Sequence, residues 1–172
     1  LPSILPEMTW QESLDVTQIY SVLGMLTPDE PLVMHRPFRS PHHTISNMGL
    51  TGGGTNPKPG EISMAHKGVL FLDEIAEFQK STLELLRQPM ENHSIRILRA
   101  NGSYDFPAEF FLVAAMNPCP CGHLGSRTQQ CRCTPMQIRR YLNRISGPLL
   151  DRIDIQIEVP PVDFEALTAK GG

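Results

Sequence analysis

The sequence predicts an α/β fold in which helices cover a mainly parallel sheet. Stretches with strand-like and helix-like patterns alternate along the chain, which is the arrangement that builds such folds. Residues 68–72 and 110–115 are apolar runs, as expected for strands buried on both faces of a parallel sheet. Asp73 and Glu74 follow the first run and Asn117 follows the second, and open α/β sheets bind ligands at the carboxyl ends of their strands.

Length and composition agree with one folded domain. The chain has 172 residues, of which 40% are hydrophobic and 19% charged, so it can bury a core and is not a disordered chain. The formal net charge of −3 excludes a strongly basic protein that coats nucleic acid. No segment approaches the about 18 consecutive apolar residues of a membrane helix, so we expect a cytoplasmic protein without a membrane partner. The chain begins with Leu1 rather than Met, and we expect it to be a piece of a longer protein.

The first part of the chain predicts one helix, one short strand and one long loop. Thr9 and Glu12 have the spacing of a capping box, and apolar residues follow at helical spacing, so we expect a helix over residues 10–23. A short strand is expected over residues 31–36. Residues 37–60 are rich in glycine and proline and predict a loop, whose length is typical of functional loops.

A helix and a hairpin are expected between the two apolar runs. The helix begins near Lys80, and Pro89 disturbs its end. Residues 94–106 alternate in polarity on either side of Asn101 and Gly102, a pair of residues that strongly favours a hairpin turn.

The last part of the chain predicts another helix and a final strand. Thr134 and Pro135 have the pattern of an N-cap followed by proline at the first helical position. The helix is expected to stop near Gly147 and Pro148. Residues 153–159 alternate between apolar and polar side chains, which predicts a strand with one wet face or a strand at a sheet edge.

The acidic pair and the asparagine are the candidate catalytic residues. Asp73 can hold a magnesium ion, usually through its water shell, and Glu74 can polarise an attacking water. Asn117, at the end of a similar strand, can orient that water without adding negative charge. The alternative is that the two carboxylates only cap the next helix, whose N-terminus favours negative charge.

Four cysteines form a candidate metal site. Cys119 and Cys121 are separated by nine residues from Cys131 and Cys133, and paired thiols in a loop of a cytoplasmic protein suggest a structural zinc site. The one-residue spacing within each pair is shorter than the usual two to four residues. His123 is an alternative ligand, and free buried cysteines or a redox-labile pair are the alternatives to a metal site.

Five segments, taken in their order and spacing, resemble the magnesium-chelatase-like AAA+ ATPases of the YifB/ComM subfamily. They are residues 36–44, 68–74, 85–89, 117–122 and 147–153. The resemblance covers residues 1–166 and implies a three-layer, P-loop NTPase-like AAA+ core. This core is incomplete in the chain, which lacks the first strand and the P-loop, since no Gly-x-x-x-x-Gly-Lys-Ser/Thr segment is present. Residues 167–172 are expected to begin a linker to a helical lid or to be a tail.

The resemblance also implies a role for each candidate catalytic residue. Asp73 and Glu74 match the Walker B pair, which binds magnesium with ATP and activates water, and Asn117 matches sensor 1. Arg152 matches the arginine finger, which such proteins insert into the site of the neighbouring subunit. For Arg152 the alternative is an ion pair with Asp151 or with Asp154. Because the Walker A motif is absent, we expect this fragment alone to be inactive.

Residues 37–60 and 94–107 match the two insertions that face the central pore in ring assemblies of this family. The resemblance implies that the parent protein forms a ring, expected to be a hexamer, and that these insertions meet DNA. The alternative is that their basic residues are ordinary exposed side chains. The candidate contacts are Arg96, Arg99, His42 and His43.

The function expected from the resemblance is ATP hydrolysis coupled to DNA remodelling, as in branch migration during natural transformation. A first alternative is a magnesium-chelatase motor subunit that acts on a protein partner, although the cysteine-rich loop at residues 117–134 argues against it. A second alternative is a non-catalytic binding module stabilised by zinc.

Overall fold

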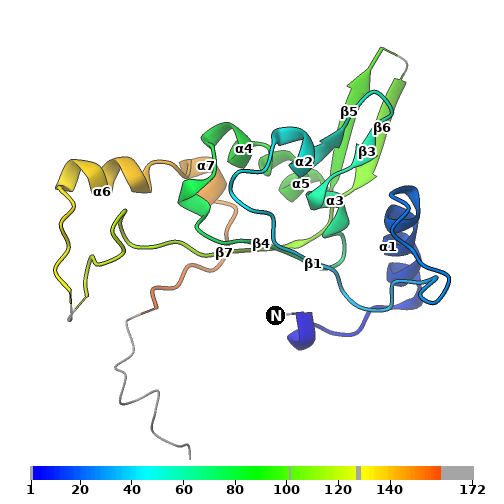
Figure 1. The fold of residues 1–172 in the computed structure, drawn as a ribbon, viewed down its shortest axis with the longest axis horizontal. Helices are drawn as coiled ribbons and strands as arrows, with labels where there is room; N and C mark the ends of the chain where they lie inside the picture. Colours follow the sequence, from blue (N-terminus) through cyan, green and yellow to red (C-terminus); the bar gives the residue numbers. More distant parts are fainter. Residues whose placement is uncertain (1, 101, 127–128, 160–172) are drawn as a thin grey trace, which may run out of the picture.

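The computed structural model describes residues 2–100, 102–126 and 129–159. Helices and strands alternate along the chain, and a β-hairpin projects from one end (Figure 1). The elements are η1 Pro2–Ile4, α1 Trp10–Val22, β1 Phe38–Arg39, α2 Asn47–Thr51, β2 Gly52–Gly53, β3 Lys58–Pro59, α3 Glu61–Met64, β4 Val69–Leu72, η2 Ile75–Glu77, α4 Lys80–Glu84, α5 Arg87–Asn92, β5 Ser94–Arg99, β6 Gly102–Pro107, β7 Phe111–Ala114, α6 Pro135–Leu142 and α7 Gly147–Leu150. Asn101 of the predicted turn and the predicted tail 167–172 lie outside the described residues.

A three-stranded parallel sheet in the order β1-β4-β7 forms the centre of the fold. β4 lies in the middle, with Val69 opposite Phe38 of β1 and Leu72 opposite Ala114 of β7. In Figure 1, α2, α4 and α5 lie on one side of this sheet. The α/β prediction is therefore confirmed. The core between sheet and helices includes the buried side chains of Leu50, Ile62, Leu70, Leu72, Leu83 and Leu86.

The close approach of β1 and β4 requires glycine at position 68. The backbone N–H of Val69 donates to the Pro37 carbonyl at 2.8 Å. A Cβ atom added at Gly68 would lie only 2.1 Å from that same carbonyl oxygen. The absence of a side chain at Gly68 thus allows the sheet to form where the two strands begin to pair.

Two expectations for the first part of the chain need correction. The strand predicted over residues 31–36 is not formed, and β1 begins at Phe38 instead, where pairing with β4 is available. The predicted loop over residues 37–60 contains β1, the short helix α2 and the β2–β3 ribbon. The helix over residues 10–23 is confirmed as α1, with the predicted capping box of Thr9 and Glu12.

The helix predicted from Lys80 is divided into α4 and α5. The break at Leu85 and Leu86 precedes Pro89, which itself lies inside α5. A proline ring clashes with the carbonyl four residues earlier, here that of Leu85, so the interruption falls before the proline rather than at it. The hairpin is confirmed as β5 and β6, with Ser94 paired to Pro107 at its base.

Two predictions for the second half of the chain are wrong: the burial of the strand at residues 110–115 on both faces, and the strand at residues 153–159. β7 is an edge strand among the described residues, and Phe111 is 60% exposed, so the strand is not buried on both faces. Residues 153–159 form no strand, and Ile155 and Ile157 are exposed. α6 ends at Leu142, and the Gly-Pro pair at residues 147–148 begins α7 instead of ending α6.

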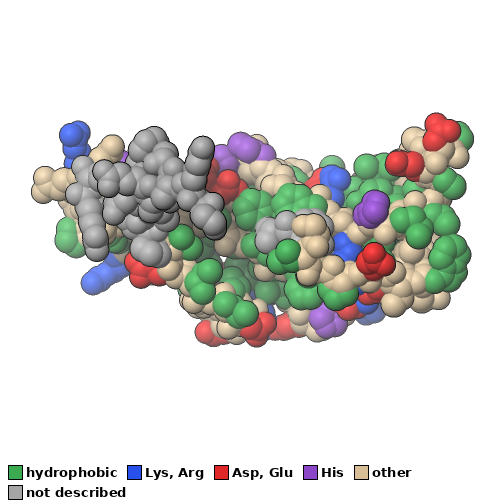
Figure 2. All heavy atoms as spheres, turned by 90° about the horizontal axis from the view of Figure 1, so that it is seen from below, with side chains coloured by type: hydrophobic (Ala, Val, Ile, Leu, Met, Phe, Trp, Pro, Cys, Tyr) green, Lys and Arg blue, Asp and Glu red, His purple; other side chains and the backbone are tan. Residues whose placement is uncertain are grey.

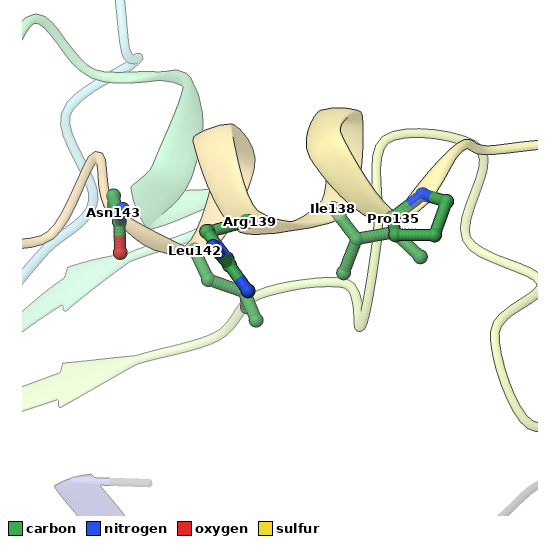
Figure 3. Close-up of a pocket in the computed structure, with 5 residues that line it drawn as sticks. All are labelled: Pro135, Ile138, Arg139, Leu142 and Asn143. Atoms are coloured by element: carbon green, nitrogen blue, oxygen red, sulfur yellow. The ribbon is translucent and has the colours of Figure 1, made fainter.

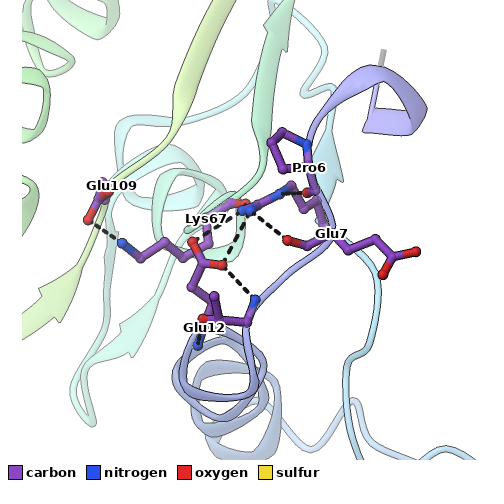
Figure 4. A network of polar contacts seen from close by, with 7 residues as sticks. Pro6, Glu7, Glu12, Lys67 and Glu109 are labelled. Carbon is purple, nitrogen blue, oxygen red and sulfur yellow. Dashed lines mark hydrogen bonds and ion pairs between the residues drawn. The ribbon is translucent and has the colours of Figure 1, made fainter.

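A network of polar contacts joins the N-terminal segment and α1 to Lys67, just before β4 (Figure 4), and Arg36 is at its centre. Its guanidinium donates to the carbonyls of Pro6 at 2.6 Å, Glu7 at 3.3 Å and Lys67 at 2.7 Å. It also pairs with the Glu12 carboxylate of α1 at 3.3 Å. One side chain therefore holds together the N-terminal segment, α1 and the residue before β4. We refer to these contacts of Arg36 as the Arg36 clamp.

Figure 2 shows the molecule from below, where hydrophobic side chains reach the surface among charged and polar ones. Within residues 2–100, 102–126 and 129–159, no helix has the length and apolar character needed to cross a membrane.

Candidate functional site

The carboxyl ends of β4 and β7 bring the acidic pair and the asparagine to one edge of the sheet. Ala115 extends the pairing of the two strands, since its N–H donates to the Leu72 carbonyl and its carbonyl accepts from the Ile75 N–H, both at 3.0 Å. Asp73 and Glu74 lie between these two hydrogen bonds, and Asn117 follows two residues after Ala115. The predicted neighbourhood is therefore formed, whereas the catalytic role of each residue stays a prediction.

Glu74 has an unusual backbone conformation. Its φ and ψ are 49° and 46°, in the left-handed region, which costs a non-glycine residue about 1 kcal/mol or more. Its N–H donates to Asp73 Oδ1 at 2.9 Å, and its own side chain makes no capping hydrogen bond to η2. Both carboxylates are exposed. The Glu74 side chain does not act as a helix cap, and such strained residues cluster at functional sites.

Arg152 contacts α5 and α7 within the chain. Its guanidinium pairs with Glu91 of α5 and donates to the carbonyl of Pro148 in α7. The expected alternative partners, Asp151 and Asp154, are not the ones the structure shows. An arginine finger acts on a neighbouring subunit, so this role also stays a prediction.

The four cysteines converge in the loop between β7 and α6. Cys119 Sγ lies 3.4 Å from Cys121 Sγ and 3.7 Å from Cys131 Sγ, and the Cys133 sulfur lies within 4.8 Å of the other three. Four sulfurs placed tetrahedrally at about 2.3 Å from a zinc ion lie about 3.8 Å from one another. The observed spacing therefore fits a tetrahedral metal site. His123, the alternative ligand, does not belong to this cluster in the part of the chain that the structure describes.

The thiols differ in acidity. Hydrogen bonds from the backbones of His123 and Arg132 lower the pKa of Cys121 to about 6. Burial, together with the neighbouring Cys121 thiol, raises the pKa of Cys133 to about 12. Thiolates are the form that binds metal, and a cation at the centre of the cluster would favour that form for all four thiols.

Helix α6 follows the cysteine loop. Two residues, one at its end and one just beyond it, are held against the rest of the fold in a way that the sequence did not indicate. Arg144, just beyond its end, donates to the Ala76 carbonyl at 2.8 Å and pairs with Glu77 at 2.9 Å, both in η2. Tyr141 is buried. In the sequence, nothing distinguished Arg144 from Arg139 and Arg140, which are exposed.

One side of α6 forms an open, mostly apolar groove of about 370 Å³ (Figure 3). None of the residues at the ends of β4 and β7 lines it. The groove is lined by Pro135, Ile138, Arg139, Leu142 and Asn143.

The two predicted pore insertions touch each other. Arg99 at the end of β5 donates to the carbonyl of Gly54 in the β2–β3 turn at 3.3 Å. Arg96, which is 62% exposed, pairs with Asp105 across the hairpin at 2.7 Å. The rings of His42 and His43 lie against each other at an interplanar angle of 35°, with their centroids 4.0 Å apart. The candidate basic residues thus belong to a continuous structure, and their contact with DNA stays a prediction.

Comparisons with known proteins indicate the relationships of this chain. The model of the family described as magnesium chelatase, subunit ChlI, matches residues 1–167. The chain is 52% identical over 164 residues to competence protein ComM of Haemophilus influenzae, and this match covers 93% of the chain and 31% of the relative. It is 48% identical over 160 residues to a protein named YifB of Salmonella typhimurium, with 93% and 31% covered.

A relative from Mycobacterium tuberculosis is 47% identical over 173 residues, covering 100% of the chain and 34% of the relative. The chain thus spans about a third of the length of these relatives. Among solved structures, NtrX from Brucella abortus in complex with ADP superposes with a TM-score of 0.47 at 17% identity, covering 70% of this chain and 24% of that one.

Proposed function

The chain belongs to the magnesium chelatase subunit ChlI family and resembles its YifB/ComM members, and on this premise we propose that the full-length protein is an ATP-hydrolysing motor. The observation that carries the proposal is the position of Asp73, Glu74 and Asn117 just after the adjoining ends of the paired strands β4 and β7. Ligands of open α/β sheets bind at this edge. The left-handed backbone of Glu74 supports a functional role for its carboxylate.

In this proposal each residue acts on the terminal phosphate or on the attacking water. Asp73, exposed at the end of β4, would hold the magnesium ion of MgATP through its water shell. The ion supplies positive charge that offsets the charge of the transferred phosphoryl group. The Glu74 carboxylate orients the water and accepts its proton, and the Asn117 amide hydrogen-bonds the phosphate or the water.

The test of this proposal is the Glu74→Gln variant of the full-length protein. Glutamine keeps the shape of the side chain but cannot accept the proton, so we expect turnover to fall about 100-fold or more. Glu30→Gln makes the same change of carboxylate to amide at an exposed residue outside the sheet. It serves as the control and should leave turnover unchanged. Wild-type turnover in Glu74→Gln would contradict the mechanism.

We also propose that the protein forms a ring in which Arg152 serves the site of the neighbouring subunit. An Arg152→Ala subunit keeps its own carboxylates, and a Glu74→Gln subunit keeps its arginine, so a mixed ring contains some complete sites. For random mixing of equal amounts and independent sites, about a quarter of wild-type activity should return. If the mixture stays as inactive as its components, Arg152 does not act between subunits.

DNA is the proposed polymer on which the motor acts. The proposal is supported by the name of the ComM relative, a competence protein, and by the hairpin with its exposed Arg96. ATPase activity of the full-length protein should rise with DNA and lose this stimulation as salt increases, because phosphate contacts release counterions. ATPase activity that DNA does not change would favour the alternative function, a motor subunit of a chelatase, after which the family is named.

Zinc is the proposed metal of the cysteine cluster. Its sulfur spacing matches a tetrahedral site, and a fully thiolate-bound ion would hold the two ends of the loop together. Elemental analysis should find one zinc ion per chain more in the wild type than in a Cys121→Ser, Cys131→Ser double variant. Four thiols that react with a thiol reagent in the native wild-type protein would contradict the site.

A further inference from the structure

The cysteine loop begins beside Asn117, the residue that matches sensor 1. Cys119 follows Asn117 by two residues and is completely buried. The N–H of Gly122 donates to the Cys119 carbonyl at 3.0 Å, which forms a tight turn with Gly122 in the left-handed region at φ 78°. A Cβ atom added at Gly122 would lie 4.0 Å from Asn117 Oδ1. The turn that carries the first thiol therefore lies alongside the Asn117 amide.

The same loop returns to the sheet edge through α6. Cys133, the last thiol, directly precedes Thr134, the N-cap of α6. Beyond the other end of the helix, Arg144 donates to the Ala76 carbonyl at 2.8 Å and to the Glu77 carboxylate at 2.9 Å. These two acceptors belong to η2, which starts directly after the acidic pair.

A side chain of α6 itself reinforces this contact. Tyr141 is 5% exposed, and the backbone of Asn117 lies close enough to its hydroxyl to lower the pKa of the phenol. Burial raises the pKa of this phenol, and the Glu77 carboxylate adds to the shift. Arg140, in contrast, is exposed and forms no ion pair among the described residues. Tyr141 at the end of α6 and Arg144 just beyond it thus face Asn117 and η2, whereas Arg140 faces solvent.

We propose that the metal-bound cysteine loop and α6 form a clamp that positions Asn117 and the segment after Glu74 for ATP hydrolysis. The inference rests on the proposed function and names Tyr141 and Arg144 as its positioning residues. The cysteine cluster fixes the start of the loop to its end, so α6 leaves the cluster in a defined direction. Arg144 and Tyr141 then transmit that direction to η2 and to the end of β7, where a displacement of about 1 Å can cost about 100-fold in rate.

The test compares Arg144→Ala, Arg144→Lys and Tyr141→Phe in the full-length protein, with Arg140→Ala as the matched control. Three quantities are measured for each variant: the turnover number for ATP, the stoichiometry of nucleotide binding, and hydrogen exchange of residues 75–77 and 115–118. We expect Arg144→Ala to lower turnover about 10- to 100-fold while it binds the full stoichiometry of nucleotide. Exchange in both segments should become faster, and Arg144→Lys should recover part of both losses.

Three outcomes would overturn the clamp. Turnover and exchange of Arg144→Ala equal to those of Arg140→Ala would show that the contact positions nothing. A parallel loss of turnover and nucleotide stoichiometry in both Arg144→Ala and the milder Arg144→Lys would show that Arg144 supports the fold as a whole and does not position the two segments. A chelator that removes the zinc without changing exchange in residues 115–118 would separate the metal from Asn117. The exchange data decide the clamp even in a protein without ATPase activity, whereas Glu74→Gln decides the proposed function.

Discussion

Replacement of Arg36 by alanine should loosen the N-terminal segment and α1 from the sheet. Only 12% of the Arg36 side chain is exposed, and its guanidinium serves four acceptors. Water can replace the arginine at the carbonyls of Pro6 and Glu7, whose hydrogen bonds are exposed. The carbonyl of Lys67 is part-buried and has no such replacement. The loss at Lys67 therefore dominates the free-energy cost.

The size of the effect follows from these contacts. A hydrogen bond from a charged donor contributes about 1.5–3 kcal/mol net, and contacts of one guanidinium do not add fully. Glu12 stays partly satisfied without Arg36, because it also accepts the Thr9 N–H at 2.8 Å, the largest cause of its lowered pKa. We expect Arg36→Ala to lower the free energy of local opening by about 2–3 kcal/mol.

Hydrogen exchange of the full-length protein measures this opening directly. A loss of about 2–3 kcal/mol corresponds to exchange about 30- to 150-fold faster in residues 9–22 and 67–70. Arg36→Lys keeps the charge but not the planar fork, so its exchange should lie between wild type and alanine. Unchanged exchange in Arg36→Ala, or equal exchange in the two variants, would refute the assignment of this stability to the Arg36 clamp.

Three further predictions concern the sheet, a buried histidine and the metal. Gly68→Ala should destabilise the protein by about 3 kcal/mol or more, since its Cβ would meet the Pro37 carbonyl, whereas Gly147→Ala meets no atom within 4 Å and should melt like the wild type. Burial lowers the pKa of His66, whose Nδ1 accepts the Glu109 N–H, so the unfolded state binds the proton more readily and stability should fall as pH drops below about 6.5. The variant His66→Asn should flatten that dependence, and an unchanged profile would exclude His66 as its source. Chelation should release the cysteine cluster to thiol reagents and lower the melting temperature; a protein whose melting is insensitive to chelators would speak against a structural metal.

The placement of Asp73, Glu74 and Asn117 at one edge of the sheet was predictable from the sequence because the signals for it are local. The run of buried residues in β4 and the Asp-Glu pair that follows it are contiguous, and the polar end of β7 is equally close in sequence. The capping boxes at Thr9 and Thr134 were also predicted, since each depends on four consecutive residues. The strand over residues 153–159 was not formed, because an alternating pattern makes a strand only where a neighbour supplies hydrogen bonds.

Long-range contacts were not predictable from the same patterns. Arg144 and Glu77 are 67 residues apart, and Arg36 and Lys67 are 31 residues apart. Nothing in the sequence around Arg36 and Arg144 indicated that their guanidinium groups, unlike that of Arg140, would form such contacts. The convergence of the four thiols could be suspected from spacing, but the distances between their sulfurs depend on the folded path of the whole loop.

The α/β class, the family resemblance and the residue types at the sheet edge were all predictable from the sequence, because hydrophobic periodicity and short motifs act over a few residues. Only the tertiary structure decided that the cysteine loop and α6 turn back onto Asn117 and η2. That arrangement depends on side chains meeting across large sequence separations, where burial and hydrogen-bond geometry select the partners. For the same reason Arg152 pairs with the distant Glu91 and not with Asp151 or Asp154, which are its neighbours in the sequence.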